Sequence, residues 1–403
     1  MVVTRNRFII LLLLLMTNFI TTLCANHDSE KQWRELEFRI DTLLNSAINK
    51  EIIPGGVVCI VRENNILLKK AYGHRCVIPT ECEMTTETIF DLASLSKCIS
   101  TATAIMQLEE QGKLSLDDNV KKYVPDFKPW IKGRDTIDIK LKQLLSHSSG
   151  VQPGLTEKDV NRLFNQWGGA NTDSLTEYIA TKTYRKFRPG TKCLYSCLNF
   201  IVLQSIAEKI SGEKLDVYAR KNIFDILGMN NTRYIHTGSE FPVDVNIAAT
   251  TVFGDSVALQ GQVHDMTARI LNDGVSGNAG VFSNADNIAL FCMAIMNGGE
   301  LNGKRILKKE TVDLMTSIAR DDEPNVGRAL GWDVNSPYSN IMGKKIRKHK
   351  CVCHTGYTGT SIVMDLETKT AIILLTNRVH PKDKGSLKKT RNELADIVAD
   401  YIF

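Results

Sequence analysis

The sequence has no strong excess of either charge, no internal repeat and no low-complexity linker. Its formal net charge is +5, and Arg5 and Arg7 near the N-terminus contribute two of these charges, which leaves +3 for the rest of the chain. So small an excess favours neither nucleic acid nor an anionic membrane as a partner. The 403 residues are enough for one large domain or two closely packed ones.

Two widespread hydrolase motifs are also missing. Gly-x-Ser-x-Gly, the nucleophile motif of α/β-hydrolases, and His-Glu-x-x-His, the zinc motif of many peptidases, do not occur. A metal site built from Cys351, Cys353 and His354 is conceivable, but adjacent ligands on one strand with no matching second pair do not favour zinc. We therefore expect no metal and no cofactor.

The apolar run near the N-terminus, from Phe8 to Met16, is too short to predict a membrane-spanning helix. Arg5 and Arg7 precede it and Leu23-Cys24-Ala25 follows it, which is the layout of a secretory signal with a small residue at the cleavage site. We predict a signal peptide over residues 1–25, export as a periplasmic or secreted protein, and no membrane insertion after cleavage. A lipid anchor on Cys24 and an uncleaved N-terminal anchor are the alternatives.

Cleavage after Ala25 would leave nine of the ten cysteines, and export would permit disulfides. An odd number leaves at least one thiol free unless it pairs between chains. Cys76 and Cys82, separated by a turn at Pro79, are the most plausible local pair. Most of the other cysteines lie in apolar runs, where a thiol usually serves as a small buried hydrophobic group.

Charge is almost absent between Asp91 and Glu109, where Lys97 is the only charged residue. An uncharged run that ends at Gly112 predicts a buried central helix, on which Ser94 and Lys97 lie one turn apart. Burial disfavours the ammonium form, so we expect the pKa of Lys97 to fall and its amine to accept a proton from Ser94. Ser94 is therefore a candidate nucleophile, placed where the positive end of a helix favours developing negative charge.

Strand patterns occur at both ends of the chain and helical patterns lie between them. The expected helices and strands at the ends cover residues 29–50, 57–62, 66–72, 351–355, 360–365, 370–377 and 387–403. This order predicts an α/β (α+β) fold in which the N- and C-terminal strands form one antiparallel sheet flanked by helices. The sheet part would span about 29–90 and 346–403, with an inserted, mainly helical part over about 91–345. A cleft between the two parts is the natural place for a small-molecule site.

Two further segments offer groups for serine chemistry, which needs a second acid-base group and a means of holding the substrate. Tyr195-Ser196-Cys197 follows a turn and precedes an apolar helix, so Tyr195 could project from a loop. His354-Thr355-Gly356 ends a late strand, where Gly356 would let a substrate backbone approach the strand edge and His354 would add a polar or cationic group.

In this order, Ser-x-x-Lys, Tyr-x-x and His-Thr-Gly resemble the motifs of the serine β-lactamase and penicillin-binding protein superfamily. The resemblance is closest to class C β-lactamase-like serine hydrolases and to related D,D-peptidases and esterases, and it covers roughly residues 53–381. Further segments also look like that family: residues 144–150, 261–265, 274–283, 354–361 and 375–378. The resemblance implies a β-lactamase/transpeptidase-like fold for a hydrolase domain over residues 26–403.

The resemblance also implies roles for individual residues. Ser94 would be the acylated nucleophile, Lys97 would activate it, and Tyr195 would shuttle protons. The backbone N–H groups of Ser94 and Tyr357 would form the oxyanion hole. The substrate would be contacted by His354, Thr355, Gly356, Tyr357 and Cys197, whereas His264 and Asp265 would be structural.

Two positions depart from the family pattern. His354 stands where many members have lysine, which implies a weaker, pH-dependent cation for a substrate carboxylate. Cys197 stands where the family usually has asparagine, and a thiol is a poor donor and acceptor, which puts efficient β-lactam hydrolysis in doubt.

The resemblance implies an exported serine hydrolase that acts through an acyl-enzyme on a small ester, amide or peptide, such as an esterase or a D-Ala-D-Ala peptidase. One alternative is an acyltransferase that passes the same acyl group to an alcohol or amine. Another is a non-catalytic penicillin-binding or sensor module, which predicts loss of the nucleophile, lysine or tyrosine; Ser94, Lys97 and Tyr195 are all present.

Overall fold

The computed structural model describes residues 31–242, 245–253, 257–318, 327–334, 341–346 and 351–402. The predicted signal peptide, its cleavage site and Cys24 lie outside the described residues. Within these ranges, no helix has the length and apolar character needed to cross a bilayer.

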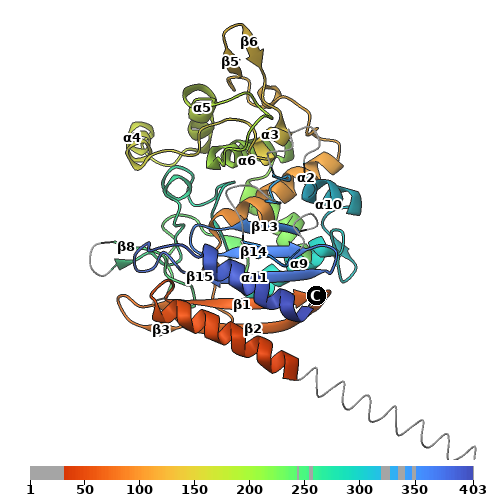
Figure 1. Ribbon diagram of the computed structural model, residues 1–403. Coiled ribbons are helices and arrows are strands. Elements are labelled where there is room, and N and C mark those ends of the chain that lie inside the picture. The colour runs from red at the N-terminus through yellow and green to blue at the C-terminus, as the bar shows by residue number, and fades with distance from the viewer. Residues whose placement is uncertain are drawn as a thin grey trace, which may run out of the picture.

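A six-stranded antiparallel sheet joins the two ends of the chain, as the sequence predicts (Figure 1). Its strand order is β13-β14-β15-β1-β2-β3. The N-terminal strands are β1 (Gly55–Arg62), β2 (Asn65–Cys76) and β3 (Cys82–Glu83), and the C-terminal strands are β13 (Cys351–Thr355), β14 (Ser361–Asp365) and β15 (Thr370–Thr376). The two groups meet where β1 pairs with β15, in a register that sets Gly56 opposite Thr376. Strand β13 therefore lies at one edge of the sheet.

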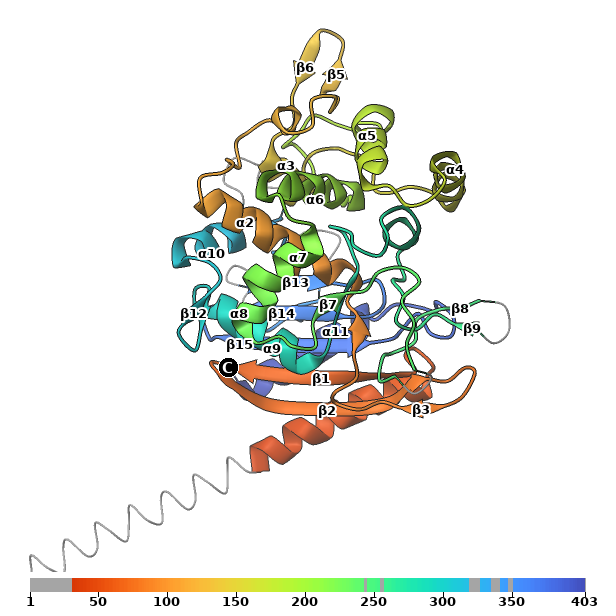
Figure 2. The same ribbon diagram turned by 180° about the vertical axis from the view of Figure 1, so that it is seen from behind.

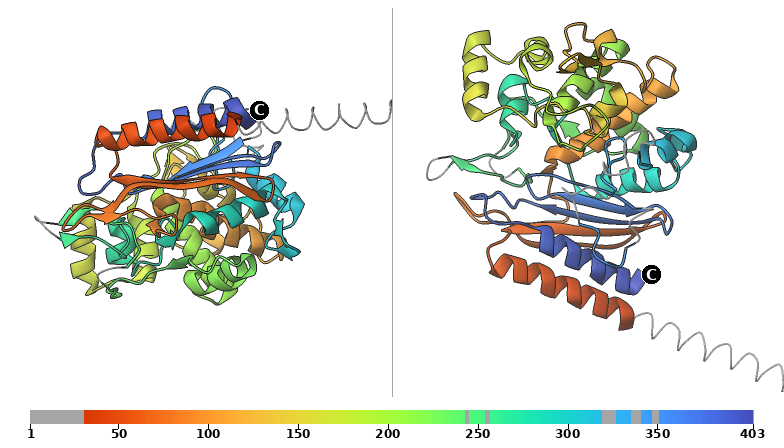
Figure 3. Two further views of the ribbon diagram at one scale, coloured as in Figure 1. Left: turned by 90° about the horizontal axis from the view of Figure 1, so that it is seen from below. Right: turned by 45° about the horizontal axis from the view of Figure 1, so that its top comes forward.

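Helices cover both faces of this sheet. The N-terminal helix (residues 31–49) and α11 (Lys388–Ile402) lie side by side on one face (Figure 3). Val58 and Ile60 of β1 point into that layer, whereas Val57, Cys59 and Val61 point into the larger core on the opposite face. The alternation of β1 thus supplies both cores, because successive strand residues point to opposite sides.

The helical part of the chain lies on the opposite face of the sheet (Figure 2). Its helices are α2 (Thr103–Glu110), α3 (Leu141–Leu145), α4 (Glu157–Trp167), α5 (Thr172–Lys182), α6 (Cys197–Ser211), α7 (Leu215–Ala219), α8 (Asp225–Leu227), α9 (Ala285–Met296) and α10 (Lys309–Thr316). Short strands pair within it as β4 (Phe90–Asp91), β10 (Val281–Ser283) and β7 (Arg233–Tyr234), and as the hairpins β5 (Trp130–Lys132) with β6 (Asp135–Ile137), β8 (Val252–Phe253) with β9 (Val257–Ala258), and β11 (Glu300–Leu301) with β12 (Lys304–Arg305).

The central charge-free segment is buried, as predicted, but it is not one regular α-helix. It begins with a 3₁₀ turn (Ala93–Leu95), continues as a π-helical stretch (Lys97–Ala102) and becomes α-helical only in α2. Ala93 has a φ of +46°, a conformation that costs free energy for a residue with a side chain. Uniform burial removes the polar stripe that would reveal helix type, so the sequence could not show this irregularity.

Candidate active site

Ser94 lies directly after β4, in a turn that a buried carboxylate holds. The side chain of Asp91 accepts hydrogen bonds from the backbone N–H groups of Ala93 (2.8 Å) and His264 (2.7 Å). Burial raises the pKa of Asp91 to about 6, although these N–H donors act in the opposite direction. His264 thus serves the turn through its backbone, in accord with the structural role implied for it.

The turn between β13 and β14 also braces the segment before Ser94. The hydroxyls of Thr358 and Thr360 donate to the backbone carbonyls of Asp91 (2.8 Å) and Leu92 (2.9 Å). The helical part and the edge of the sheet are therefore fastened together beside Ser94.

Lys97 is completely buried, with 0% of its surface exposed. Its Nζ donates to Ser94 Oγ at 3.0 Å, to the backbone carbonyl of Asn278 at 2.8 Å and to Cys197 Sγ at 3.6 Å. The aromatic ring of Tyr195 lies 5.1 Å away. Three elements that are distant in the sequence thus converge on one ammonium group.

The expectation of a lowered Lys97 pKa is wrong in direction. Burial does lower the pKa, but interactions with Cys197 and Tyr195 outweigh it, and the net pKa of Lys97 is raised. Burial in turn raises the pKa of the Tyr195 phenol and of the Cys197 thiol. The three groups therefore titrate as one coupled set, and one proton must leave this set before Ser94 can be activated.

Tyr195 lies in the loop before α6, as predicted, and lines the same pocket as Ser94, and both Ser94 and Lys97 act to lower the pKa of its phenol against the effect of burial. Its ring centroid is 4.3 Å from that of His147 and 6.0 Å from that of His354. His147 Nδ1 accepts from the Ser196 backbone N–H at 3.1 Å, and burial holds the pKa of His147 well below its usual value. A neutral His147 therefore positions the tyrosine loop. Only its place in the family-like segment 144–150 pointed to it in the sequence.

His354 supplies a polar group rather than a cation at neutral pH, and the sequence left both open. Burial and the nearby charges of Arg328 and Lys97 hold the pKa of His354 well below its usual value, so the ring is neutral at pH 7. The fixed cation beside it is Arg328, whose guanidinium lies 3.5 Å from His354 Nε2. Arg328 forms a buried ion pair with Asp333 at 2.7 Å. No motif surrounds Arg328 in the sequence, and sequence reasoning missed it.

Asp333 also places this pair against the sheet edge. Its backbone exchanges hydrogen bonds of 2.9 and 2.8 Å with Cys353, so it covers the outer edge of β13 at that residue. Two residues further, Thr355 has the same orientation along the strand and lines the pocket. Among the described residues, the edge of β13 at Thr355 is thus open to a ligand in the pocket that Ser94 lines.

Gly356 is required by close packing of the chain against itself. A Cβ there would lie 2.1 Å from Thr360 Oγ1 and 2.4 Å from the Leu92 carbonyl oxygen. The adjacent Tyr357 is 59% exposed, and Arg378 donates to its carbonyl oxygen at 2.8 Å. These contacts, rather than an approaching substrate, account for the glycine and fix the Tyr357 backbone.

A pocket with a volume of about 520 Å³ joins these groups. Its lining residues are Ser94, Tyr195, Arg328, His354, Thr355, Gly356, Tyr357, Arg378, Asp383, Gly385, Ser386, Leu387 and Arg391. The lining includes three arginines and one carboxylate, that of Asp383, so positively charged side chains outnumber negatively charged ones. Arg391 comes from α11 and donates to the Thr360 carbonyl at 3.0 Å, while its Nε is buried with no partner among the described residues.

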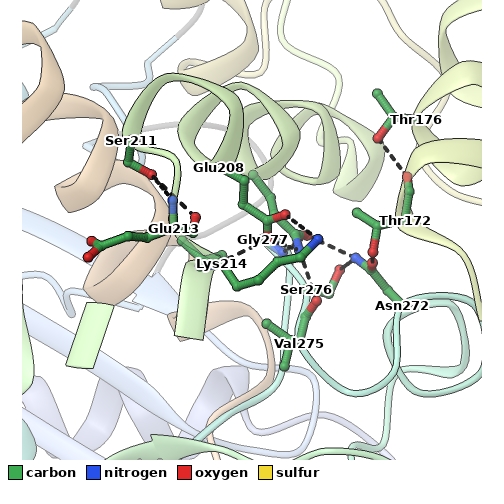
Figure 4. Close-up of polar contacts among 12 residues, drawn as sticks. Thr172, Thr176, Glu208, Ser211, Glu213, Lys214, Asn272, Val275, Ser276 and Gly277 are labelled. Atoms are coloured by element: carbon green, nitrogen blue, oxygen red, sulfur yellow. Dashed lines mark hydrogen bonds and ion pairs between the residues drawn. The ribbon is translucent and has the colours of Figure 1, made fainter. Parts of the chain in front are cut away.

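A polar network fixes the loop whose Asn278 carbonyl accepts from Lys97, and Figure 4 shows the part of it around Asn272, Ser276 and Gly277. Asn272 Nδ2 donates to Ser276 Oγ at 2.9 Å and to Gln204 Oε1 at 2.8 Å. The backbone N–H of Gly277 donates to the same Gln204 oxygen at 2.8 Å. Ser276 Oγ in turn donates to Asn278 Oδ1 at 2.7 Å. Helix α6 therefore holds both the Cys197 side and the Asn278 side of the lysine.

No disulfide joins the described cysteines. Cys76 and Cys82 face each other across β2 and β3 but are not bonded, so their disulfide stays a prediction. Cys351 and Cys353 pack into the core beneath α11, whereas His354, between them and Gly356, faces the pocket. The alternation of β13 thus separates the three groups that the sequence offered as a metal site, and the described residues contain no group of three metal-binding side chains.

The model of the β-lactamase family matches residues 40–396. The chain belongs to this family. It is a serine hydrolase of the β-lactamase and penicillin-binding protein type, and the predicted fold is confirmed. The sensor-module alternative is not supported.

Curated relatives cover most of the chain. One from Bacillus subtilis (strain 168), named "N-acetylmuramyl-L-alanine amidase", is 33% identical over 81% of this chain and 78% of its own length. Another from Escherichia coli (strain K12), named "Putative D-alanyl-D-alanine carboxypeptidase", is 31% identical over 81% of this chain and 79% of its own length. A solved structure titled "EstCE1, a hydrolase with promiscuous acyltransferase activity" has a TM-score of 0.72 at 23% identity, covering 91% of this chain and 99% of that one. That last likeness shows the fold alone.

Proposed function

We propose that this β-lactamase-family hydrolase acts through an acyl-enzyme on Ser94, and that its substrates are small esters, amides or peptides with a carboxylate near the scissile carbonyl. The observation that carries the proposal is the placement of two buried cations around one serine. Lys97 lies 3.0 Å from Ser94 Oγ, and Arg328 lines the same pocket. Lys97 would take part in proton transfer, and Arg328 would bind the substrate carboxylate.

Activation begins when the cluster of Lys97, Tyr195 and Cys197 loses a proton. The proton of Ser94 then passes to Lys97 or Tyr195 as the oxygen attacks the carbonyl carbon. The backbone N–H groups of Ser94 and Tyr357 would stabilise the oxyanion. Tyr195, near both Ser94 and Lys97, would return the proton to the leaving group. In deacylation the same proton transfers would run in reverse, so that water attacks the acyl-enzyme and releases the acyl group from Ser94.

Arg328 supports an anionic substrate. A guanidinium can bind a carboxylate through two parallel hydrogen bonds, and Arg328 Nε is buried without a partner in the described chain. Its ion pair with Asp333 keeps the guanidinium in place beside Thr355 and the neutral His354. The carboxypeptidase name of the Escherichia coli relative supports the same substrate class.

Acyl transfer to an alcohol or amine is the second candidate. The pocket of about 520 Å³ has room for an acceptor beside a small acyl group. The first half-reaction is identical, so product analysis in the presence of an alcohol would separate the two activities. For the cellular setting, we propose export through residues 1–25 and a mature hydrolase domain over residues 26–403. A mature N-terminus that begins at residue 1 would contradict this part.

A pair of matched esters tests the substrate class. The two share an acyl group and a leaving group, and only one carries a carboxylate next to the carbonyl. We expect the wild-type protein to prefer the carboxylate ester, and Arg328→Lys to reduce that preference by about 10- to 100-fold, because lysine cannot form the paired bonds. Rates for the neutral ester should change far less. Equal losses on both esters would contradict a recognition role for Arg328.

A further inference from the structure

Cys197 is the second group besides Ser94 that offers a nucleophilic atom to Lys97. Its Sγ lies 3.6 Å from Lys97 Nζ, and its side chain is partly exposed. It is the first residue of the 15-residue helix α6, whose N-terminus favours negative charge. Its backbone N–H donates to the Pro153 carbonyl at 2.8 Å, which fixes the sulfur in place.

Asn278 supplies an independent observation at the same sulfur. This residue is 1% exposed, and its Nδ2 is buried without an oxygen or nitrogen acceptor in the described chain. Because Asn278 Oδ1 accepts from Ser276 at 2.7 Å, the amide orientation is set. Its amide acts on the Cys197 thiol, where it opposes the rise in pKa that burial causes. Two strong donors, Asn278 Nδ2 and Lys97 Nζ, therefore surround a sulfur atom that is a poor acceptor.

We propose that Cys197 is an oxidation site, at which peroxide adds one oxygen atom to the sulfur and thereby suppresses acylation of Ser94. In this step the thiolate sulfur attacks one peroxide oxygen, the O–O bond breaks, and hydroxide leaves and takes up the thiol proton as water. The sulfur loses two electrons and the peroxide gains them. Cysteine thiol and hydrogen peroxide thus give sulfenic acid and water.

The neighbours of Cys197 offer an added oxygen two donors. A sulfenate oxygen would accept from Asn278 Nδ2 and from the Lys97 ammonium, so the modified state satisfies the buried amide. The same contact holds the Lys97 proton. Loss of activity then follows because Lys97 no longer exchanges a proton with the serine. This last step rests on the proposed function of Lys97, whereas the oxidation itself does not.

Most other described cysteines are less accessible to peroxide. Cys59, Cys76, Cys98, Cys292, Cys351 and Cys353 are buried. Cys193 is partly exposed like Cys197 and lies in the same loop region, four residues earlier in the chain. It therefore provides a matched control thiol.

The test treats the full-length protein with hydrogen peroxide and follows two quantities in the same samples. Peptide mapping after reaction with dimedone, a sulfenic-acid reagent, gives the fraction of Cys197 that is oxidised. The rate of Ser94 labelling by a fluorophosphonate, which phosphonylates an activated serine, gives the reactivity of the nucleophile. We expect oxidation at Cys197, a labelling rate that falls in proportion by at least about tenfold at full occupancy, and recovery after dithiothreitol.

Two variants locate the effect. Cys193→Ser should keep the sensitivity of the wild-type protein, and Cys197→Ser should lose it relative to its own untreated rate. Unmodified Cys197 under peroxide, or full Cys197 oxidation without a fall in labelling, would overturn the proposal. The occupancy measurement needs only wild-type protein, so it decides the matter even if Cys197→Ser fails to fold. Oxidation of Cys197 in Ser94→Ala separates this proposal from the proposed function, since it requires no nucleophilic serine.

Discussion

Two buried cations belong to the candidate site, Lys97 bonded to Ser94 and Arg328 in the pocket that Ser94 lines, and they have opposite surroundings. Arg328 has a carboxylate partner, Asp333, at 2.7 Å. Lys97 has no carboxylate within ion-pair distance in the described chain, and its neighbours are a hydroxyl, a thiol and a carbonyl oxygen. A guanidinium in an ion pair keeps its charge at all relevant pH values, whereas an ammonium among weak acids can exchange its proton. The type of partner, and not burial alone, therefore distinguishes a binding cation from a catalytic one.

Removing the exchangeable cation should have the largest effect. Lys97→Ala should lower the rate of Ser94 acylation by about 100- to 10,000-fold, because general acid-base assistance is worth that much. Stopped-flow labelling with an activated ester measures it. Lys122→Ala, which removes an exposed ion pair with Asp118, serves as the control and should leave the rate unchanged. A near-wild-type rate in Lys97→Ala would mean that another group activates the serine.

Removing the partner of the fixed cation should affect folding rather than proton transfer. Asp333→Asn leaves the buried guanidinium of Arg328 uncompensated, which costs about 3–5 kcal/mol of unfolding free energy. Urea denaturation gives the value, and Asp313→Asn, at an exposed ion pair with Lys309, should show no measurable loss. If Asp333→Asn were as stable as the wild-type protein, Asp333 would not be needed to compensate the buried charge of Arg328.

Acid should weaken the fold through histidines that are kept neutral. The pKa values of His147, His354 and His380 are all lowered by burial, that of His380 to about 4. As pH falls below about 6.5, these histidines therefore take up protons in the unfolded chain before they do so in the folded protein. Each one then lowers the free energy of unfolding by up to about 1.4 kcal/mol per pH unit, until the pH reaches its pKa in the folded protein.

Thermal denaturation between about pH 7 and pH 4 should show this loss of stability. His380→Asn should make the curve shallower. His236→Asn should not, because His236 is exposed and Asp273 raises its pKa. A flat stability profile in the wild-type protein would contradict neutral buried histidines.

The smallest expected effect concerns the neighbour of Lys97. If Cys197 limits recognition of a substrate amide, Cys197→Asn should raise the turnover of a chromogenic cephalosporin relative to that of a p-nitrophenyl ester by several-fold, about 1 kcal/mol. The ratio of the two rates in one protein preparation measures it and cancels differences in folded fraction. An unchanged ratio would remove Cys197 from the explanation of β-lactam preference.

The sheet was predictable because its strands carry their own signals. The apolar run at residues 351–355 matches β13 in full, and the predicted strand 370–377 differs from β15 by one residue. The helix type around Ser94 was not predictable. Burial on all sides removes the periodicity that distinguishes an α-helix from a π-helix, and the bracing by Asp91 and Thr360 joins segments that are far apart in the chain.

The candidate site was also predictable only in part. Short motifs located Ser94, Lys97, Tyr195 and His354, and the structure brings all four together. Arg328 and the net direction of the Lys97 pKa depend on tertiary contacts, with Asp333 and with Cys197 and Tyr195. A sequence shows which groups are present, but it does not show which of them share a buried space.

Ser94 is the nucleophile on which the proposed function depends. Intact-mass analysis of the full-length protein after exposure to a fluorophosphonate, which phosphonylates an activated serine, tests this role, with peptide mapping to locate the adduct. We expect one adduct per chain, located on Ser94, and none in Ser94→Ala. An adduct that persists in Ser94→Ala at the wild-type rate would show that another residue is the nucleophile.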